Sequence, residues 1–181
     1  MRMTVSDETL AEAAALGDAD SFAALISRHY DRLFAFAFRL TGSRSEAQDL
    51  TQDICAALPA KLASYRAEAR FSTWLYRITV NAAHDRRRRL ATRTKAADGW
   101  GDWEVNRRAA DAEMRDQIDW LTQAMRALPP DLRETVVLIL GEELTQKDAA
   151  QVLGLSEGTI AWRMSEVKKH LRATREKEAE A

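Results

Sequence analysis

The sequence predicts an all-α protein built from two small helical domains joined by a flexible linker, with a helix-turn-helix as the C-terminal domain. Apolar residues recur at helical spacing through most of the 181 residues, and no stretch alternates as a half-buried strand would. Seven Gly and three Pro are also too few for the turns of an all-β sandwich. Hydrophobic residues make up 46% and charged residues 30%, which is the composition of a globular protein.

The first domain is predicted over residues 1–91 and starts with two helices. Residues 6–16 are expected to form a short helix that ends at a glycine. Asp20 or Ser21 can cap the second helix, because a short polar side chain accepts a hydrogen bond from the free amides of a first turn. Gly42 then ends this second helix.

The third helix opens with a capping box. Ser43 and Glu46 stand three residues apart, which places a hydroxyl and a carboxylate where they can satisfy the first free amides. Pro59 comes late in the segment and is expected to kink or end the helix. The apolar stripe of this helix leaves three polar side chains facing outward: Asp49, Gln52 and Asp53.

Residues 65–70 are predicted to form a loop, and a fourth helix starts at Phe71 or Ser72. Aromatic and basic side chains are interleaved along both segments, a pattern suited to single-stranded DNA, since bases stack on rings while cations follow the phosphates. The alternative is that the rings only fill the core, and we prefer this for Trp74. Tyr65 lies in the loop without apolar partners at helical spacing, which favours the DNA-contacting role.

The second domain is predicted over residues 107–181. Between the two domains, residues 92–106 lose the helical periodicity and carry two glycines, so they are predicted to be the linker. Helices are expected over residues 107–128, which end at a Pro-Pro pair, and over residues 132–140, which end at a glycine.

A helix-turn-helix is predicted at the end of the second domain. Thr145 caps its first helix, Gly154 supplies the positive φ of a tight turn, and Ser156 caps a second helix that runs to about Arg175. The second helix buries an apolar stripe: Ile160, Met164, Val167 and Leu171. On or beside its exposed face are Thr159, Trp162, Arg163, Glu166 and His170.

The net charge of −1 hides two basic islands. Residues 65–95 carry nine basic and two acidic side chains, a net +7, and residues 158–175 sum to +4, whereas residues 1–64 sum to −3. Such islands are typical of a protein that binds a polyanion at two places. The alternatives are a solvated helix end for the Arg run at 86–89 and a purely structural helix pair at the C-terminus. We also expect acidic segments to lie against the basic islands in the free protein and to weaken indiscriminate DNA binding until a larger partner separates the two domains.

These motifs resemble the extracytoplasmic-function (ECF) group of bacterial RNA polymerase sigma factors. Similar to the family's second conserved region are Asp49-Leu50-Thr51-Gln52-Asp53, Phe71-Ser72-Thr73-Trp74-Leu75-Tyr76-Arg77-Ile78, Asn81, Asp85 and the Arg run. Similar to its fourth region are Leu128-Pro129-Pro130-Asp131-Leu132-Arg133-Glu134 and Gly154-Leu155-Ser156-Glu157-Gly158-Thr159-Ile160. The two regions cover most of residues 20–175 in the family's order.

The resemblance implies a protein that joins core RNA polymerase and directs it to promoters, without catalysis, cofactor or metal of its own. The implied polymerase-binding residues are Asp49, Gln52 and Asp53. The residues implied to recognise the minus-ten element as melted single strand are Tyr65, Arg66, Arg77, Asn81, Asp85 and Arg86. The residues implied to read the minus-thirty-five element as duplex are Ser156, Thr159, Trp162, Arg163, Glu166 and Lys169.

The chain departs from the family on the groove-facing side of its second helix-turn-helix helix. Family members often have a basic residue where this chain has Ala161 or Glu166, and a small polar residue where it has Trp162. The usual minus-thirty-five sequence is therefore not assumed. Glu166 can accept a hydrogen bond from a cytosine amino group, and Trp162 can exclude some bases.

The residues themselves indicate neither an enzyme nor a metal site. Cys55 is the sole cysteine and has no nearby histidine, and three histidines are too scattered for a zinc site. His84 and Asp85 are neighbours on a helix and cannot face each other. No apolar run approaches the roughly 18–20 residues that span a bilayer, and the N-terminus lacks the apolar core of a signal peptide, so we expect a cytoplasmic protein without membrane insertion.

The partners implied by the resemblance are core RNA polymerase, promoter DNA and an anti-sigma factor. Two other functions stay open. One is a sigma-mimicking adaptor that binds an anti-sigma factor without binding DNA. The other is a conventional helix-turn-helix regulator, which would bind duplex DNA without polymerase, usually as a symmetric dimer.

Overall fold

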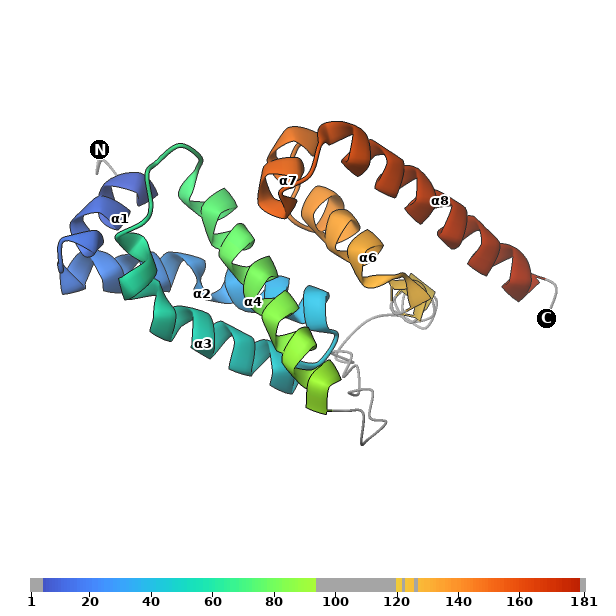
Figure 1. The fold of residues 1–181 in the computed structure, drawn as a ribbon, viewed down its shortest axis with the longest axis horizontal. Coiled ribbons are helices and arrows are strands. Elements are labelled where there is room, and N and C mark those ends of the chain that lie inside the picture. The colour runs from blue at the N-terminus through green and yellow to red at the C-terminus, as the bar shows by residue number, and fades with distance from the viewer. Residues whose placement is uncertain (1–4, 94–119, 122, 126, 180–181) are drawn as a thin grey trace, which may run out of the picture. The chain divides into compact units, whose positions relative to one another are not determined.

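The regular elements of the computed structural model are helices in all the residues that it describes (Figure 1). The described residues are 5–93, 120–121, 123–125 and 127–179. They belong to two compact units, one within residues 1–100 and the other within residues 101–181. The predicted all-α fold class is confirmed, whereas the domain boundaries stay a prediction, because residues 94–106 of the expected linker lie outside the described ranges.

The described part of the first unit holds α1 (Asp7–Ala15), α2 (Ala19–Thr41), α3 (Arg44–Leu62) and α4 (Phe71–Arg93). Local signals account for most of their ends. Ser43 accepts a hydrogen bond from the Glu46 amide at 3.4 Å, as the capping box predicts. Ser6, expected inside the first helix, is its cap and accepts from the Thr9 amide at 3.2 Å. Gly42 ends α2 at φ +73°, a left-handed conformation that glycine adopts without a steric penalty.

The start of α2 corrects the prediction that Asp20 or Ser21 caps this helix. Asp18 is the cap: its carboxylate accepts from the Asp20 amide at 3.2 Å and from the Ser21 hydroxyl at 2.5 Å. Asp18 has extended backbone directly after Gly17, which turns at φ +97°. The helix therefore begins as soon as the glycine turn is complete, and the later polar residues fall inside its first turn.

Pro59 lies inside α3 and does not end it, so that part of the prediction is wrong, whereas the alternative of a kink stays a prediction. The helix continues to Leu62 because a proline so close to the end removes only one hydrogen bond, from its missing amide to Cys55. Leu58 and Leu62 are both buried in the core of the unit and hold the last turn in place.

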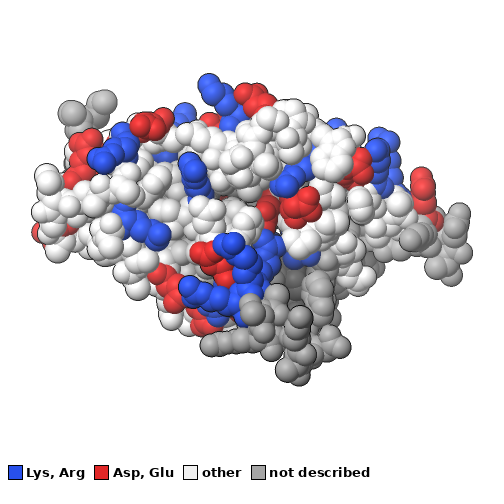
Figure 2. All heavy atoms as spheres, in the orientation of Figure 1, with Lys and Arg blue, Asp and Glu red and all other residues white. Residues whose placement is uncertain are grey.

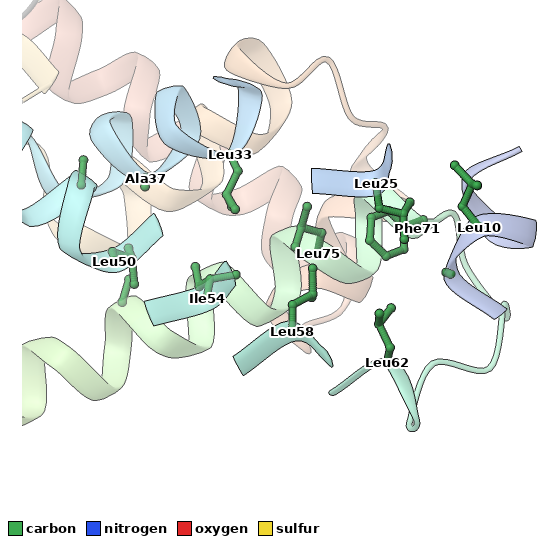
Figure 3. Packing of buried hydrophobic residues seen from close by; sticks show 13 residues of the cluster. Leu10, Leu25, Leu33, Ala37, Leu50, Ile54, Leu58, Leu62, Phe71 and Leu75 are labelled. Atoms are coloured by element: carbon green, nitrogen blue, oxygen red, sulfur yellow. The ribbon is translucent and has the colours of Figure 1, made fainter. Parts of the chain in front are cut away.

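The core of the first unit lies among its four described helices. Figure 3 shows Phe71 beside Leu25, with Leu10 of α1 close to them, and Leu50 and Ile54 of α3 facing the fourth helix. Burial of one such side chain contributes roughly 1.5–3 kcal/mol. The core therefore ties α1 and the start of α4 to the long helices α2 and α3.

An ionic contact attaches α1 to α2. The Asp7 carboxylate accepts hydrogen bonds from Arg28 at 2.9 Å and from His29 Nε2 at 2.7 Å, and Arg28 also donates to the Val5 carbonyl at 2.7 Å. Partial burial acts to raise the pKa of Asp7, but the hydrogen bonds from Arg28 and His29 outweigh it and lower the pKa below its ordinary value.

Asp7→Asn is expected to lower the urea midpoint of unfolding at pH 6, and the deficit is expected to shrink below about pH 4. The folded pKa of Asp7 lies below its unfolded value, so its contribution is complete above the unfolded pKa of about 3.9 and is lost as the pH falls through the folded pKa. The measurement is urea unfolding by circular dichroism across this range. Glu12→Gln, on the exposed side of α1, is the control, and a pH-independent deficit for Asp7→Asn would contradict the assignment.

The second unit holds α6 (Pro130–Val136), a π-helical segment η2 (Val137–Gly141), α7 (Gln146–Leu153) and α8 (Glu157–Ala179). The described residues from 120 to 127 are also helical. The predicted single helix over 132–140 is therefore divided into α6 and η2. The helix-turn-helix starts and turns as predicted: Thr145 caps α7, and Gly154 turns at φ +66°. Its second helix, α8, continues one turn beyond the predicted end at Arg175, to Ala179.

α8 packs against α6 and α7 through the predicted apolar stripe. Ile160 and Val167 are buried, and Met164 and Leu171 are half-buried beside Leu128 and Leu132. Ser156 caps α8 by accepting a hydrogen bond from the Thr159 amide at 3.1 Å. The opposite side of α8 is left available to a partner.

A buried arginine joins α6 to the helical residues before it. Arg133 is only 8% exposed and donates from Nε to the Met125 carbonyl at 2.9 Å and from a terminal nitrogen to the Leu128 carbonyl at 3.1 Å. The last carbonyls of a helix have no partner within the helix. Arg133 satisfies two of them, which explains why an arginine is buried three residues after the Pro-Pro pair.

Candidate nucleic-acid interface

The structure brings together side chains that the sequence assigned to two different partners. Arg86 of α4 donates to the Asp49 carboxylate at 2.6 Å and to the Asp53 carboxylate at 3.3 Å, both on α3. The carboxylates are largely exposed, whereas Arg86 is 29% exposed. An expected DNA-binding cation is thus held by two expected polymerase-binding anions of the same unit.

A groove of about 430 Å³ runs between α3 and α4 beside this ion pair. Apolar residues from both helices line it, including Ile54 and Ile78. Polar and charged side chains also line it: Asp53, Lys61, Asn81, Asp85, Arg86 and Arg89. The groove therefore carries both signs of charge, and Figure 2 shows Lys and Arg side chains intermixed with Asp and Glu side chains toward the carboxyl-terminal part of α4.

The other predicted residues on α3 and α4 are exposed. Gln52 lies on the same outward side of α3 as the two aspartates, and Arg77 and Asn81 are exposed along α4. Asp85 is exposed as well and forms an ion pair with Arg88 one turn later. These placements leave the side chains accessible, and their assignments to particular partners stay predictions.

Tyr65 has tertiary apolar partners that helical spacing did not reveal. Its ring lies 5.8 Å from the Phe71 ring and 5.1 Å from the Trp74 ring, and its hydroxyl donates to the Ala69 carbonyl at 2.8 Å. Burial, together with the carboxylates of Glu8, Glu12 and Asp7 on α1, raises the pKa of Tyr65. Helical spacing does not reveal these partners, because the loop folds back onto the start of α4, and the DNA-contacting role of Tyr65 stays a prediction.

Within the 65–70 loop, the backbone is strained at one residue. Ala67 has φ +54°, a left-handed conformation that residues with a Cβ atom rarely adopt. Arg66, beside it, is exposed. Such conformations persist where the surrounding structure holds them and are frequent at binding sites.

On α8, the predicted duplex-reading residues differ sharply in exposure. Trp162 is 58% exposed, on the side of α8 away from its buried stripe. Lys169 is also exposed and forms an ion pair with Glu166 at 2.5 Å. Ser156 and Thr159 hydrogen-bond to each other at 2.9 Å at the start of the helix. The amino-terminal half of α8 thus presents a large apolar ring and small hydroxyl groups.

Arg163 points to the protein and not away from it. Its side chain is 16% exposed and forms an ion pair with the Asp131 carboxylate at 3.6 Å and a hydrogen bond to the Asp131 carbonyl at 3.3 Å. Asp131 lies in the Leu-Pro-Pro motif, but nothing in that motif indicates a partner 32 residues away, so the sequence does not predict this contact. A DNA contact by Arg163 would require this side chain to leave α6.

The described residues contain no group of three or more His, Cys, Asp or Glu side chains placed to hold a metal ion. Partial burial raises the pKa of the Cys55 thiol, which disfavours the nucleophilic thiolate. None of the helices in the described ranges is long and apolar enough to cross a membrane.

Two family models match the chain. Sigma-70 region 2 matches residues 25–93, and Sigma-70, region 4 matches residues 118–171. The ECF RNA polymerase sigma factor SigM of Mycobacterium tuberculosis is 34% identical over 167 residues, which are 92% of this chain and 83% of that protein.

Two solved structures have a similar fold. CnrH in complex with the cytosolic domain of CnrY superposes with a TM-score of 0.69 at 25% identity, covering 94% of this chain and 97% of CnrH. The sigma factor RpoE in complex with the anti-sigma factor NepR from Bartonella quintana superposes with a TM-score of 0.74 at 24% identity, covering 87% and 98% of the two chains. At this identity, the RpoE structure shows a similar fold and no more.

Proposed function

This chain belongs to the ECF group of RNA polymerase sigma factors, and on that basis we propose how its two units divide the work of promoter recognition. The family resemblance drawn from the motifs is confirmed, and the function that follows is binding to core RNA polymerase and direction of promoter-specific transcription initiation. The observation that carries the division of labour is that the described basic residues of the first island lie on the 65–70 loop and α4, and those of the second on α8. The two matched regions contain these segments separately, up to residue 93 and up to residue 171.

In the first unit, we assign polymerase binding to the exposed polar face of α3 and single-strand binding to the 65–70 loop and α4. The α3 face consists of Asp49, Gln52 and Asp53, whose carboxylates can pair with cations on a partner. The loop and α4 offer aromatic and cationic groups for unpaired bases and phosphates. Tyr65 supports the loop from inside, while Arg66, Arg77 and Asn81 are the exposed contacts, with Asp85 and Arg86 at the groove.

In the second unit, we assign minus-thirty-five duplex recognition to α8. Trp162 is the proposed base-reading residue, and Ser156, Thr159, Glu166 and Lys169 contact bases or phosphates around it. Arg163 is a positioning residue in the conformation described: it fixes α8 to α6 through Asp131. Domain limits of 1–91 and 107–181, with a linker between them, fit this assignment.

We further propose that the chain performs no catalysis, requires no cofactor, acts in the cytoplasm where transcription takes place, and is inhibited by an anti-sigma factor. Support for the last point comes from the two similar structures, which are complexes of CnrH with the cytosolic domain of CnrY and of RpoE with the anti-sigma factor NepR.

The test of the function is run-off transcription by core RNA polymerase, with and without the purified chain, on genomic fragments, followed by mapping of the start sites. New start sites that share upstream sequences are the expected result. If the chain opens no promoter but still captures an anti-sigma factor, the adaptor function is correct. Duplex binding that needs no polymerase and follows two-fold half-sites would indicate a conventional regulator.

Asp49→Asn together with Asp53→Asn is expected to weaken binding to core RNA polymerase by about tenfold, since each lost charge pair at a partly exposed interface is worth roughly 0.5–1 kcal/mol. Binding is measured by fluorescence anisotropy of the labelled chain with core enzyme. Arg86→Ala is the matched control, because it breaks the same ion pairs and keeps both carboxylates. Equal loss in the control would show that the ion pairs, and not the carboxylates, support polymerase binding.

A further inference from the structure

The first turn of α4 is capped by a side chain from a distant helix. α4 begins directly after Arg70, whose side chain carries hydrogen-bond donors only and cannot accept from the free amides of the helix. The Glu8 carboxylate of α1 accepts instead, from the Phe71 amide at 3.3 Å, across 63 positions of sequence. A negative charge at this end of a helix is also favoured by the helix dipole.

The position of Glu8 is set by the attachment of α1. Its neighbour Asp7 is held by Arg28 and His29 of α2, and the next turn of α1 buries Leu10 in the core. The His29 ring in turn meets the Phe71 ring edge-on at 5.1 Å. Glu8 of α1 therefore holds the Phe71 amide, and His29 of α2 contacts the Phe71 ring.

Phe71 is also the residue against which the 65–70 loop closes. The Tyr65 ring packs on Phe71 at 5.8 Å, and the Tyr65 hydroxyl ties the loop to itself through Ala69. Between these two points lies Ala67, at φ +54°. Such a conformation persists where the surrounding structure holds it. Phe71 is one such anchor: its side chain is buried in the core, and Glu8 holds its amide.

We propose that Glu8 is a positioning residue for promoter melting: it holds Phe71 and thereby keeps the 65–70 loop in the shape that receives the unpaired strand. The proposal rests on the proposed function, which assigns this loop to melted DNA. A preformed loop binds without a further ordering cost, so loss of Glu8 reduces strand capture. Contacts of α3 with polymerase and of α8 with duplex do not involve this position.

The experiment compares Glu8→Ala, Glu8→Gln and Glu12→Ala in the full chain with core RNA polymerase, on a promoter fragment mapped by the run-off assay. Glu12 lies one turn later on α1 and is exposed, so its substitution is the matched control. Core binding is measured by anisotropy, closed complexes by filter binding at low temperature, and open complexes by permanganate reactivity of unpaired thymines.

Glu8→Ala is expected to lower the open-complex yield three- to tenfold while core binding and closed-complex formation change less than twofold. Glu8→Gln is expected to restore at least half of the yield, because its amide oxygen can accept from the Phe71 amide. Glu12→Ala is expected to behave as the unmodified chain. Parallel losses of core binding and open complexes in Glu8→Ala, or no rescue by Glu8→Gln, would overturn the proposal.

Amide hydrogen exchange of the free chain gives a readout that does not depend on transcription. Glu8→Ala is expected to speed exchange of the amides from residue 66 to residue 71 at least fivefold, with unchanged exchange in the middle of α2. Unchanged exchange in the loop would refute the positioning role itself. If instead the loop loosens as expected but the unmodified chain opens no promoter, the proposed function fails and the structural role of Glu8 stands.

Discussion

Ile160→Ala is expected to lower the free energy of unfolding of the second unit by about 2–4 kcal/mol. Ile160 is completely buried at the start of α8, where that helix packs on α6 and α7, and the truncated side chain would leave a cavity between the helices. Because the same helix carries the proposed duplex-reading residues, binding to the minus-thirty-five element is expected to fall as well. Urea unfolding followed by circular dichroism, with amide exchange to identify the unit that opens, measures the change.

Trp162→Ala, two positions along the same helix, is expected to weaken duplex binding without lowering stability. The ring is 58% exposed, so the free energy of unfolding is expected to change by less than about 0.5 kcal/mol. Loss of the proposed base contact is expected to weaken binding to the mapped minus-thirty-five duplex about tenfold, or about 1.4 kcal/mol. A Trp162→Ala variant that unfolds easily but still binds duplex would mean that the ring is structural.

Arg133→Met is expected to lower the free energy of unfolding of the second unit by about 2–4 kcal/mol, a loss comparable with that of Ile160→Ala. Methionine has a similar reach but no donors, so the half-buried Met125 carbonyl and the buried Leu128 carbonyl would lose this partner. The reference is Arg172→Met, on an exposed position of α8, for which a change below about 0.5 kcal/mol is expected.

The same urea titration measures both arginine variants. If Arg133→Met is as stable as Arg172→Met, water replaces the guanidinium at the two carbonyls, and the arginine does not join α6 to the helical residues before it. If Arg133→Met unfolds early, the Leu-Pro-Pro-Asp-Leu-Arg-Glu motif has a structural reason for its arginine: the helix before the Pro-Pro pair needs donors for its last carbonyls.

The ion pairs of Arg86 are expected to link the two binding activities proposed for the first unit. Arg86 is engaged by Asp49 and Asp53, so a partner that binds these carboxylates also changes the charge available on α4. Exposed ion pairs of this kind contribute little to stability, roughly 0.2–1 kcal/mol each. A partner that binds Asp49 and Asp53 can therefore readily displace Arg86 from them. Polymerase binding and single-strand binding are therefore expected to favour each other modestly in the proposed function.

Helix limits were largely predictable because their signals are local. A serine or threonine before a helix and a glycine after it act on amides and carbonyls within one turn, and so Ser43, Gly42, Thr145 and Gly154 mark the observed limits. The two differences have separate reasons. Three neighbouring polar residues can each cap α2, and local sequence does not choose Asp18 among them. Pro59 is tolerated for a tertiary reason, since the core holds the last turn of α3.

The sequence by itself determined the fold class, the family and the position of the two basic islands, because periodicity, motifs and charge are properties of residues close together in the chain. Only the tertiary structure decided which side chains meet: Arg86 with Asp49, Arg163 with Asp131, and Glu8 with the Phe71 amide. These partners are 37, 32 and 63 positions apart. Their contacts depend on how the helices pack, and no local pattern specifies the rotation and offset of one packed helix against another.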